Sequence, residues 1–227
     1  AFYECEEIAA EHNGLEKIAS WRPDLIDGDF AILMEPTDGR VEGGCQGTMR
    51  FTLEVPGRAA HSARSWVGHN AIHDLSAVLE RLNRWQERDP FVEVDGLTFR
   101  EGLNATMLDA GVAGNVIPPT ATIQINYRFA PDKTTEQARQ YMEDLFHEWP
   151  MNVLDLSAPA RPGLDRPLAK SFVAAVGGEP GPKYGWTDVA RFGQLGIPAV
   201  NFGPGNALCA HQVLSLIHIS EPTRQEA

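Results

Sequence analysis

Cysteines are scarce in this sequence. Only three occur in 227 residues, Cys5, Cys45 and Cys209, and they lie far apart. An odd and small number excludes a dense disulfide framework and favours a reduced, cytoplasmic protein. The three also lack the paired spacing that is typical of a structural zinc site.

Long apolar runs and an excess of positive charge are also missing. No stretch is long enough to span a bilayer, and the first residues lack the basic, apolar and small-residue regions of a signal peptide. Lys and Arg number 19 against 31 Asp and Glu, which gives a net charge of −12. Because nucleic-acid binding needs clustered cations, we expect no nucleic-acid partner. Because no apolar run is long enough to span a bilayer, we expect no membrane partner either. A local pair of cations would still allow an anionic small-molecule substrate.

The remaining composition is that of a globular protein, with 43% apolar and 22% charged residues. The length suits two modest domains, or one domain inserted in another. Residues 1–43 predict a strand end and loop, a short helix and a second strand, at Phe2–Glu7, Gly14–Ser20 and Phe30–Met34. Pro36 prevents the second strand from continuing in a ladder.

The pattern changes from Gly44 onward. Alternation of apolar residues predicts strands, and helical periodicity predicts one helix whose apolar side carries Ile72, Leu75, Val78, Leu79 and Leu82. A second helix, capped by Thr134 or Thr135, ends near Trp149. The resulting order, β-α-β-β-α-β, indicates a ferredoxin-like unit, with its elements at Thr48–Val55, Asn70–Arg88, Leu103–Asp109, Thr122–Phe129, 134–149 and Asn152–Ser157. Beyond a Pro-rich connection at Ala158–Pro167 we expect helices at Leu168–Val176 and Asp188–Leu195 and a strand at Ala199–Phe202.

Two carboxylate motifs are candidates for chemistry. Glu6 and Glu7 follow a strand, where a turn could bring one carboxylate to a metal and leave the other to carry protons. Beside Glu4, the pair could equally be a solvated acidic surface. Glu35 ends an apolar strand, the position at which open α/β sheets bind ligands, although it could be an ordinary strand-end acid.

Two histidines are further candidates. His211 follows the Gly-rich loop Gly203–Gly205, where a neutral imidazole suits zinc, but a lone histidine is more often structural or exposed. His61 lies in a polar turn and could donate a hydrogen bond to an oxyanion, or could be a surface residue.

Taken in order, these motifs resemble the M20 metallopeptidase family, and within it the desuccinylase branch. The resemblance runs from Ala1 to about Gln212. The motifs are Phe2-Tyr3-x-Cys5-Glu6-Glu7, Met34-Glu35-Pro36-Thr37, Gly57-x-x-x-His61-Ser62, Gly114-Asn115-Val116-Ile117-Pro118, Tyr127-Arg128-Phe129, Trp186-Thr187-Asp188-x-x-Arg191-Phe192 and Phe202-Gly203-Pro204-Gly205. The opening motif and the run at Gly44–Thr48 point to the desuccinylase branch.

The resemblance implies an α/β fold: a partial zinc-exopeptidase-type catalytic domain with an inserted ferredoxin-like (βαββαβ) dimerisation domain. The catalytic domain would comprise residues 1–43 and 159–212, and the insert residues 44–158. Residues 213–227 look like a non-native, adapter-derived tail.

The resemblance also implies a role for each candidate. Glu6 would be the general base acting on a metal-bridged water, and His61, from the neighbouring subunit of a homodimer, would stabilise the oxyanion. Glu7 and His211 would ligate one zinc ion and Glu35 the other. Substrate contacts would come from Asn115, Arg128, Thr187, Arg191 and Asn206.

The implied cofactor is Zn²⁺, two ions per subunit, with Co²⁺ as a possible substitute. The implied reaction converts the acylated amino acid N-succinyl-LL-2,6-diaminopimelate and water to succinate and LL-2,6-diaminopimelate. The family's first histidine ligand and bridging aspartate lie upstream of the Glu-Glu motif and are absent here, so we expect this polypeptide alone to be inactive.

Two alternatives stay open at this point. One is another M20 amidohydrolase, such as an acetylornithine deacetylase, an N-acyl-amino-acid deacylase or a di- or aminopeptidase. The other is a non-catalytic fragment that dimerises through its insert. Substrate comparison separates the first from a desuccinylase, and zinc titration separates the second.

Overall fold

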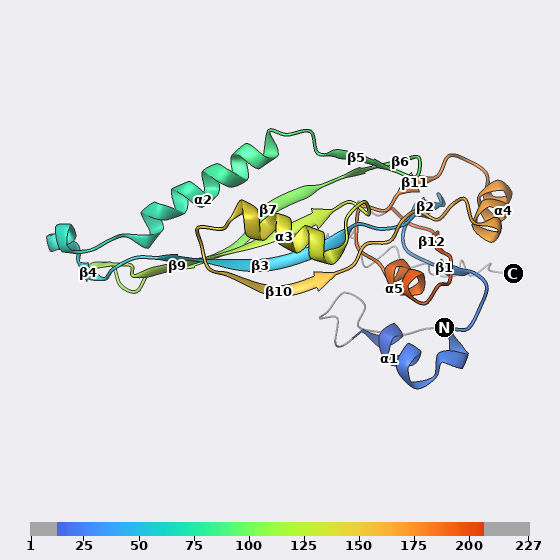
Figure 1. The fold of residues 1–227 in the computed structure, drawn as a ribbon, viewed down its shortest axis with the longest axis horizontal. Helices are drawn as coiled ribbons and strands as arrows, with labels where there is room; N and C mark the ends of the chain where they lie inside the picture. The colour runs from blue at the N-terminus through green and yellow to red at the C-terminus, as the bar shows by residue number, and fades with distance from the viewer. Residues whose placement is uncertain (1–12, 207–227) are drawn as a thin grey trace, which may run out of the picture. The chain divides into compact units, whose positions relative to one another are not determined.

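The computed structural model describes residues 13–206, and the chain divides into two compact units. Within the described residues, the first unit comprises 13–45, 93–98 and 160–206, and the second comprises 46–92 and 99–159 (Figure 1). Each unit has its own sheet and its own core. The predicted domain limits at 43/44 and 158/159 stay predictions.

The second unit is the predicted βαββαβ fold. Its antiparallel sheet has the order β10-β3-β9-β7, formed by β3 (Gly47–Pro56), β7 (Gly102–Ala110), β9 (Thr120–Phe129) and β10 (Met151–Ser157). Helix α2 (Ala71–Gln86) packs over β3, β7 and β9, and α3 (Thr135–Leu145) packs over β3 and β10. The ferredoxin-like part of the fold prediction is therefore confirmed.

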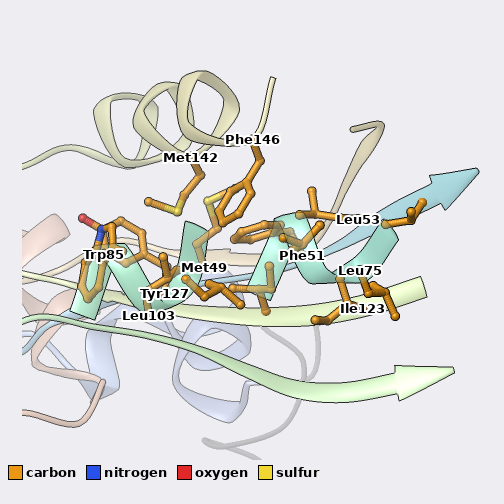
Figure 2. Packing of buried hydrophobic residues seen from close by; sticks show 14 of the residues in the cluster. Met49, Phe51, Leu53, Leu75, Trp85, Leu103, Ile123, Tyr127, Met142 and Phe146 are labelled. Atoms are coloured by element: carbon orange, nitrogen blue, oxygen red, sulfur yellow. The ribbon is translucent and has the colours of Figure 1, made fainter. Parts of the chain in front are cut away.

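Alternation along the central strands builds the core of this unit. In β3, Met49, Phe51 and Leu53 are buried while Arg50 and Glu54 are exposed. The register places these three residues opposite Tyr127, Ile125 and Ile123 of β9, so both strands bury the same face. Figure 2 shows Met49, Phe51, Leu53, Ile123 and Tyr127 in one cluster with Leu75 and Trp85 of α2, Met142 of α3 and Phe146, which directly follows α3.

Capping residues set where both helices begin. The Asn70 side chain accepts a hydrogen bond from the Ile72 amide, and Thr134 forms a capping box with Gln137. Helix α3 ends at Leu145 and not near Trp149, because Phe146 leaves the helical conformation and buries its ring. Pro150 also disfavours helical geometry at Trp149.

The expected apolar side of α2 is only partly buried. Leu75, Val78 and Leu82 face the sheet, but Ile72 and Leu79 are 43% and 44% exposed. These two residues are seven positions apart and therefore lie on one side of the helix. The helix thus has a second, uncovered apolar stripe within the described part of the chain.

A β-hairpin that was not predicted from the sequence consists of β5 (Phe91–Val94) and β6 (Leu97–Arg100). Its turn residues, Asp95 and Gly96, have φ values of 50° and 80°. Asp-Gly with both φ values positive is the signature of a type I′ hairpin turn. The sequence therefore carried the signal for this hairpin.

The first unit contains a small mixed sheet with the order β1-β12-β2-β11. Strand β1 (Ala31–Leu33) is parallel to β12 (Ala199–Asn201), which is antiparallel to β2 (Glu42–Gly43), which is parallel to β11 (Gly181–Pro182). Helices α1 (Gly14–Trp21), α4 (Pro167–Val176) and α5 (Val189–Gln194) and the 3₁₀ turn η2 (Pro23–Leu25) accompany it. All three predicted helices and both predicted strands among the described residues are present, the strands slightly shortened. Between residues 13 and 206, no helix is long and apolar enough to cross a membrane.

A buried carboxylate, Glu101, ties several elements of the second unit together. Its side chain, 2% exposed, is 2.5 Å from Arg88 and 3.0 Å from Lys133. It also accepts hydrogen bonds from the Tyr127 hydroxyl at 3.2 Å and the Ala130 amide at 3.0 Å. Burial alone would raise the pKa of Glu101, but the Ala130 amide and the two cations outweigh it and hold that pKa below its usual value.

We predict that Glu101→Gln lowers the free energy of unfolding at pH 7 by about 3 kcal/mol, because it leaves two partly buried cations without their counter-charge. A carboxyl with a depressed folded-state pKa stabilises the fold above its unfolded pKa and loses this contribution as the pH falls. The difference between variant and parent should therefore shrink below about pH 4.5. Urea denaturation at several pH values measures it. Glu54→Gln, at an exposed position of β3, is the control, and equal losses in both variants would contradict the prediction.

Candidate functional site

The predicted site residues fall into three groups. Glu6, Glu7 and His211 lie outside the described residues. Glu35, Thr187, Arg191 and Asn206 belong to the first unit, whereas His61, Asn115 and Arg128 belong to the second. Their assigned roles stay predictions, and the structure describes the local surroundings of the last two groups.

Glu35 follows the carboxyl end of β1, as expected for a ligand-binding position. Its side chain is 27% exposed, and Oε2 lies 3.7 Å from Lys183 Nζ. Lys183 also lies 3.2 Å from Glu42 Oε2. A partly exposed carboxylate backed by a buried cation is thus the central feature of this strand end.

The loop at Gly203 lies directly against the same strand end. The Gly203 amide donates to Thr37 Oγ1 at 3.1 Å, and the Thr37 and Gly39 amides donate to the Gly203 carbonyl at 3.3 and 3.0 Å. A Cβ at position 203 would collide with the carbonyl oxygen of Glu35. Only glycine therefore permits this approach, and two motifs 166 residues apart become neighbours. Asn206 closes the described part of this loop.

Thr187 belongs to a buried polar network. Its hydroxyl donates to Asn201 Oδ1 at 2.9 Å, and Asn201 Nδ2 donates to the Gly44 carbonyl at 3.1 Å. Cys45 Sγ lies 3.6 Å from the Thr187 carbonyl, and burial raises the pKa of the Cys45 thiol to about 11. Since the Thr187 hydroxyl hydrogen is already used, this side chain can offer a ligand only its lone pairs.

Arg191 is held by two carboxylates. Its guanidinium lies 3.0 Å from Asp188 Oδ1 and 2.5 Å from Glu16 Oε2, and its side chain is only 14% exposed. The Asn13 amide donates to both oxygens of Asp188, at 2.9 and 3.1 Å, and its own oxygen caps α1. The network thus connects the start of α1 to the Thr187–Arg191 motif. Asn13 was not among the predicted site residues, although Asn before a helix is a capping signal.

His61 and Asn115 are neighbours in the second unit. The short strands β4 (Ala60–His61) and β8 (Val116–Ile117) pair, and the Ser62 amide donates to the Asn115 carbonyl at 2.8 Å. His61 Nδ1 accepts from the Ala63 amide at 3.1 Å. A neutral imidazole that accepts at Nδ1 carries its hydrogen on Nε2. His61 therefore has the tautomer that an oxyanion donor requires.

Arg128 does not join this pair. It lies near the far end of β9, where its Nε donates to Asn126 Oδ1 at 3.1 Å. The strand begins at Thr120, next to β8, and its rise separates the two ends by roughly 25 Å. Within one copy of the second unit, Arg128 and His61 thus lie at opposite ends of the sheet.

The described residues fit a divalent metal only in part. Between residues 13 and 206, no three His, Cys, Asp or Glu side chains form a metal-binding group. Glu35 nevertheless has the right chemistry, because zinc accepts carboxylate oxygens and this carboxylate is partly exposed at a strand end. The remaining predicted ligands, Glu7 and His211, lie outside the described residues.

Comparisons with known proteins give one consistent result. Residues 44–148 match the model of the M20 peptidase dimerisation domain. DapE of Mycobacterium tuberculosis (strain H37Rv) is 53% identical over 212 residues, which are 92% of this chain and 59% of that protein. The succinyl-diaminopimelate desuccinylase of Corynebacterium glutamicum is 42% identical over 218 residues, 92% of this chain and 58% of its own. The chain thus spans somewhat under two thirds of these relatives.

Solved structures show the same fold at low sequence identity. A tripeptidase from Staphylococcus aureus superimposes with a TM-score of 0.61 and 19% identity, covering 84% of this chain and 54% of that one. An M20 family metallo-carboxypeptidase from Sulfolobus solfataricus gives a TM-score of 0.60 and 16% identity, covering 83% and 59%. The mixed α/β architecture is therefore shared with hydrolytic enzymes.

We predict that Thr187→Val destabilises the whole protein by about 1–3 kcal/mol, because it leaves the buried Asn201 Oδ1 without its donor. Thr187→Ser keeps the hydroxyl and should retain most of the stability. Urea denaturation followed by circular dichroism measures both. Equal midpoints for the valine variant and the parent would show that this hydrogen bond contributes nothing.

Proposed function

We propose that this chain belongs to the M20 metallopeptidase family and that the whole protein hydrolyses N-succinyl-LL-2,6-diaminopimelate to succinate and LL-2,6-diaminopimelate. The observation that carries this proposal is the likeness to a named desuccinylase over nearly the whole chain. The order of the motifs from Glu6-Glu7 to Gly203–Gly205 supports it.

The proposed cofactor is a pair of zinc ions. Glu7 and His211 would hold one ion, and Glu35 would hold the other. When bound, such ions polarise an amide carbonyl and lower the pKa of a water molecule to about 7. The strand-end carboxylate of Glu35 supports its part in the ligand set.

Glu6 is the proposed proton carrier. It takes a proton from the attacking water and delivers it to the leaving amine, a role that suits a carboxylate not engaged with a metal. His61 of a second subunit donates from Nε2 to the oxyanion that forms on the carbonyl oxygen when water adds to the amide carbon. Its Nδ1 contact with the Ala63 amide supports this assignment, since it fixes the tautomer.

The remaining predicted residues orient the substrate. Asn115, Arg128, Arg191 and Asn206 are suited to its carboxylates, which an Arg fork or an amide N–H can bind. Thr187 differs, because its hydroxyl already donates to Asn201. We therefore assign it to a substrate group that donates, such as an ammonium of diaminopimelate.

Dimerisation is proposed to use the β7 edge of the second unit. Within the described residues β7 is an edge strand, and residues 104–110 are exposed, with Met107 and Leu108 at 66% and 59%. An edge strand has unpaired backbone groups that invite another strand. Ile72 and Leu79 of the overlying α2 extend the exposed apolar surface. This edge is therefore the one best suited to a second copy.

We predict that Glu6→Gln in the whole protein lowers kcat about 10²–10⁴-fold, because a general base is lost, while two zinc ions stay bound. Glu35→Gln or His211→Ala should instead lower the zinc content. Steady-state desuccinylation and metal analysis measure both effects. The control is Glu4→Gln, which changes a neighbouring acid. Full turnover by the Glu6 variant would refute the assignment.

A charge on the β7 edge should prevent dimerisation. We predict that Leu108→Asp makes the protein monomeric at micromolar concentration, because antiparallel pairing would bury the new carboxylate. The matched control is Leu154→Asp on β10, the opposite edge of the same sheet, where Leu154 is 46% exposed. Sedimentation velocity distinguishes the two. A dimeric Leu108 variant, or a monomeric Leu154 variant, would exclude this edge.

A further inference from the structure

Lys183 is a buried cation that the motifs do not include. It is 7% exposed and follows β11, whose parallel pairing with β2 brings it beside Glu42. Lysine is almost never buried without a partner. Here it has two, with Nζ 3.2 Å from Glu42 Oε2 and 3.7 Å from Glu35 Oε2.

The two carboxylates have different relations to Lys183. Glu42 Oε2 is buried and accepts no hydrogen bond within the described part of the chain, so its ion pair with Lys183 compensates its charge. Glu35 lies farther from Nζ and its side chain is 27% exposed. Glu42 thus anchors the lysine, and the lysine in turn contacts the carboxylate at the strand end.

We propose that Lys183 is a positioning residue for Glu35: anchored by Glu42, it fixes the orientation in which the Glu35 carboxylate binds the metal. The inference rests on the proposed function, in which Glu35 is a zinc ligand. Mutation of a residue that orients a metal ligand typically lowers metal affinity about 10–100-fold.

The proposed effect of Lys183 on zinc binding is one of positioning, and it can be separated from an effect of net charge. Lys183 and Glu42 carry opposite charges, so replacing both by neutral residues leaves the net charge of the protein unchanged. What the pair supplies is a fixed point next to Glu35. Exchanging both members for neutral residues therefore removes the positioning without changing the net charge.

The test measures zinc affinity of the metal-free whole protein by competition with a chromophoric chelator. The double variant Lys183→Met/Glu42→Gln should bind one of its two zinc ions about 10–100-fold more weakly. The single variant Lys183→Arg keeps a cation beside the native Glu42 and should therefore bind both zinc ions nearly as tightly as the parent. Lys170→Met, at an exposed position of α4, is the matched control and should behave as the parent.

Glu35→Gln separates the two levels of the proposal. If it does not weaken zinc binding, the ligand assignment of the proposed function fails. If it does, and the double variant binds both ions as tightly as the parent, Lys183 is not a positioning residue. Circular dichroism verifies folding. Should the double variant not fold, Glu42→Gln alone should weaken the same ion, and unchanged affinity there overturns the inference.

Discussion

The contact between Gly203 and the end of β1 is the constraint on which the first unit depends. Position 203 admits no side chain, because a Cβ would collide with the Glu35 carbonyl, and Thr37 fixes the approach through hydrogen bonds to the Gly203 amide and carbonyl. The parallel pairing of β1 and β12 brings both segments to the same edge of the sheet. A carboxylate and a loop from distant parts of the sequence therefore meet at one point, and the chain then continues toward His211.

Buried polar groups, more than apolar area, define the surroundings of this point. Among its described residues the first unit has small apolar clusters, whereas Asn13, Asp188 and Asn201 are fully buried. Asn13 donates to Asp188, and Asn201 donates to the Gly44 carbonyl. Each bond fixes a direction as well as a distance, which apolar packing does not. The second unit is the reverse case: its core is a continuous apolar layer between one sheet and two helices, with the Glu101 cluster as its main buried charge.

Periodicity and capping were enough to predict most of the fold. Met49, Phe51 and Leu53 alternate cleanly, and Thr134 caps α3 as expected. The two-residue strands β2 and β11 escaped prediction, because so short a segment has no period. The pairing of Lys183 with Glu35 and Glu42 escaped for another reason: nothing local marks a lysine that a distant strand will bury. Ile72 and Leu79 share the helical period of the core residues, so the sequence alone could not show that they remain exposed.

The geometry of the second unit bears on how a site could be completed. His61 and Asn115 lie at one end of the sheet and Arg128 near the other, roughly 25 Å away along β9. A substrate made of one diamino acid and a four-carbon acyl group cannot reach both ends. If all three residues contact substrate, as proposed, they contact different molecules within one copy of this unit. Pairing of two copies along β7, whose strands would run antiparallel, places the His61 end of each copy toward the Arg128 end of the other. The proposed dimer and the proposed roles of these residues therefore require each other.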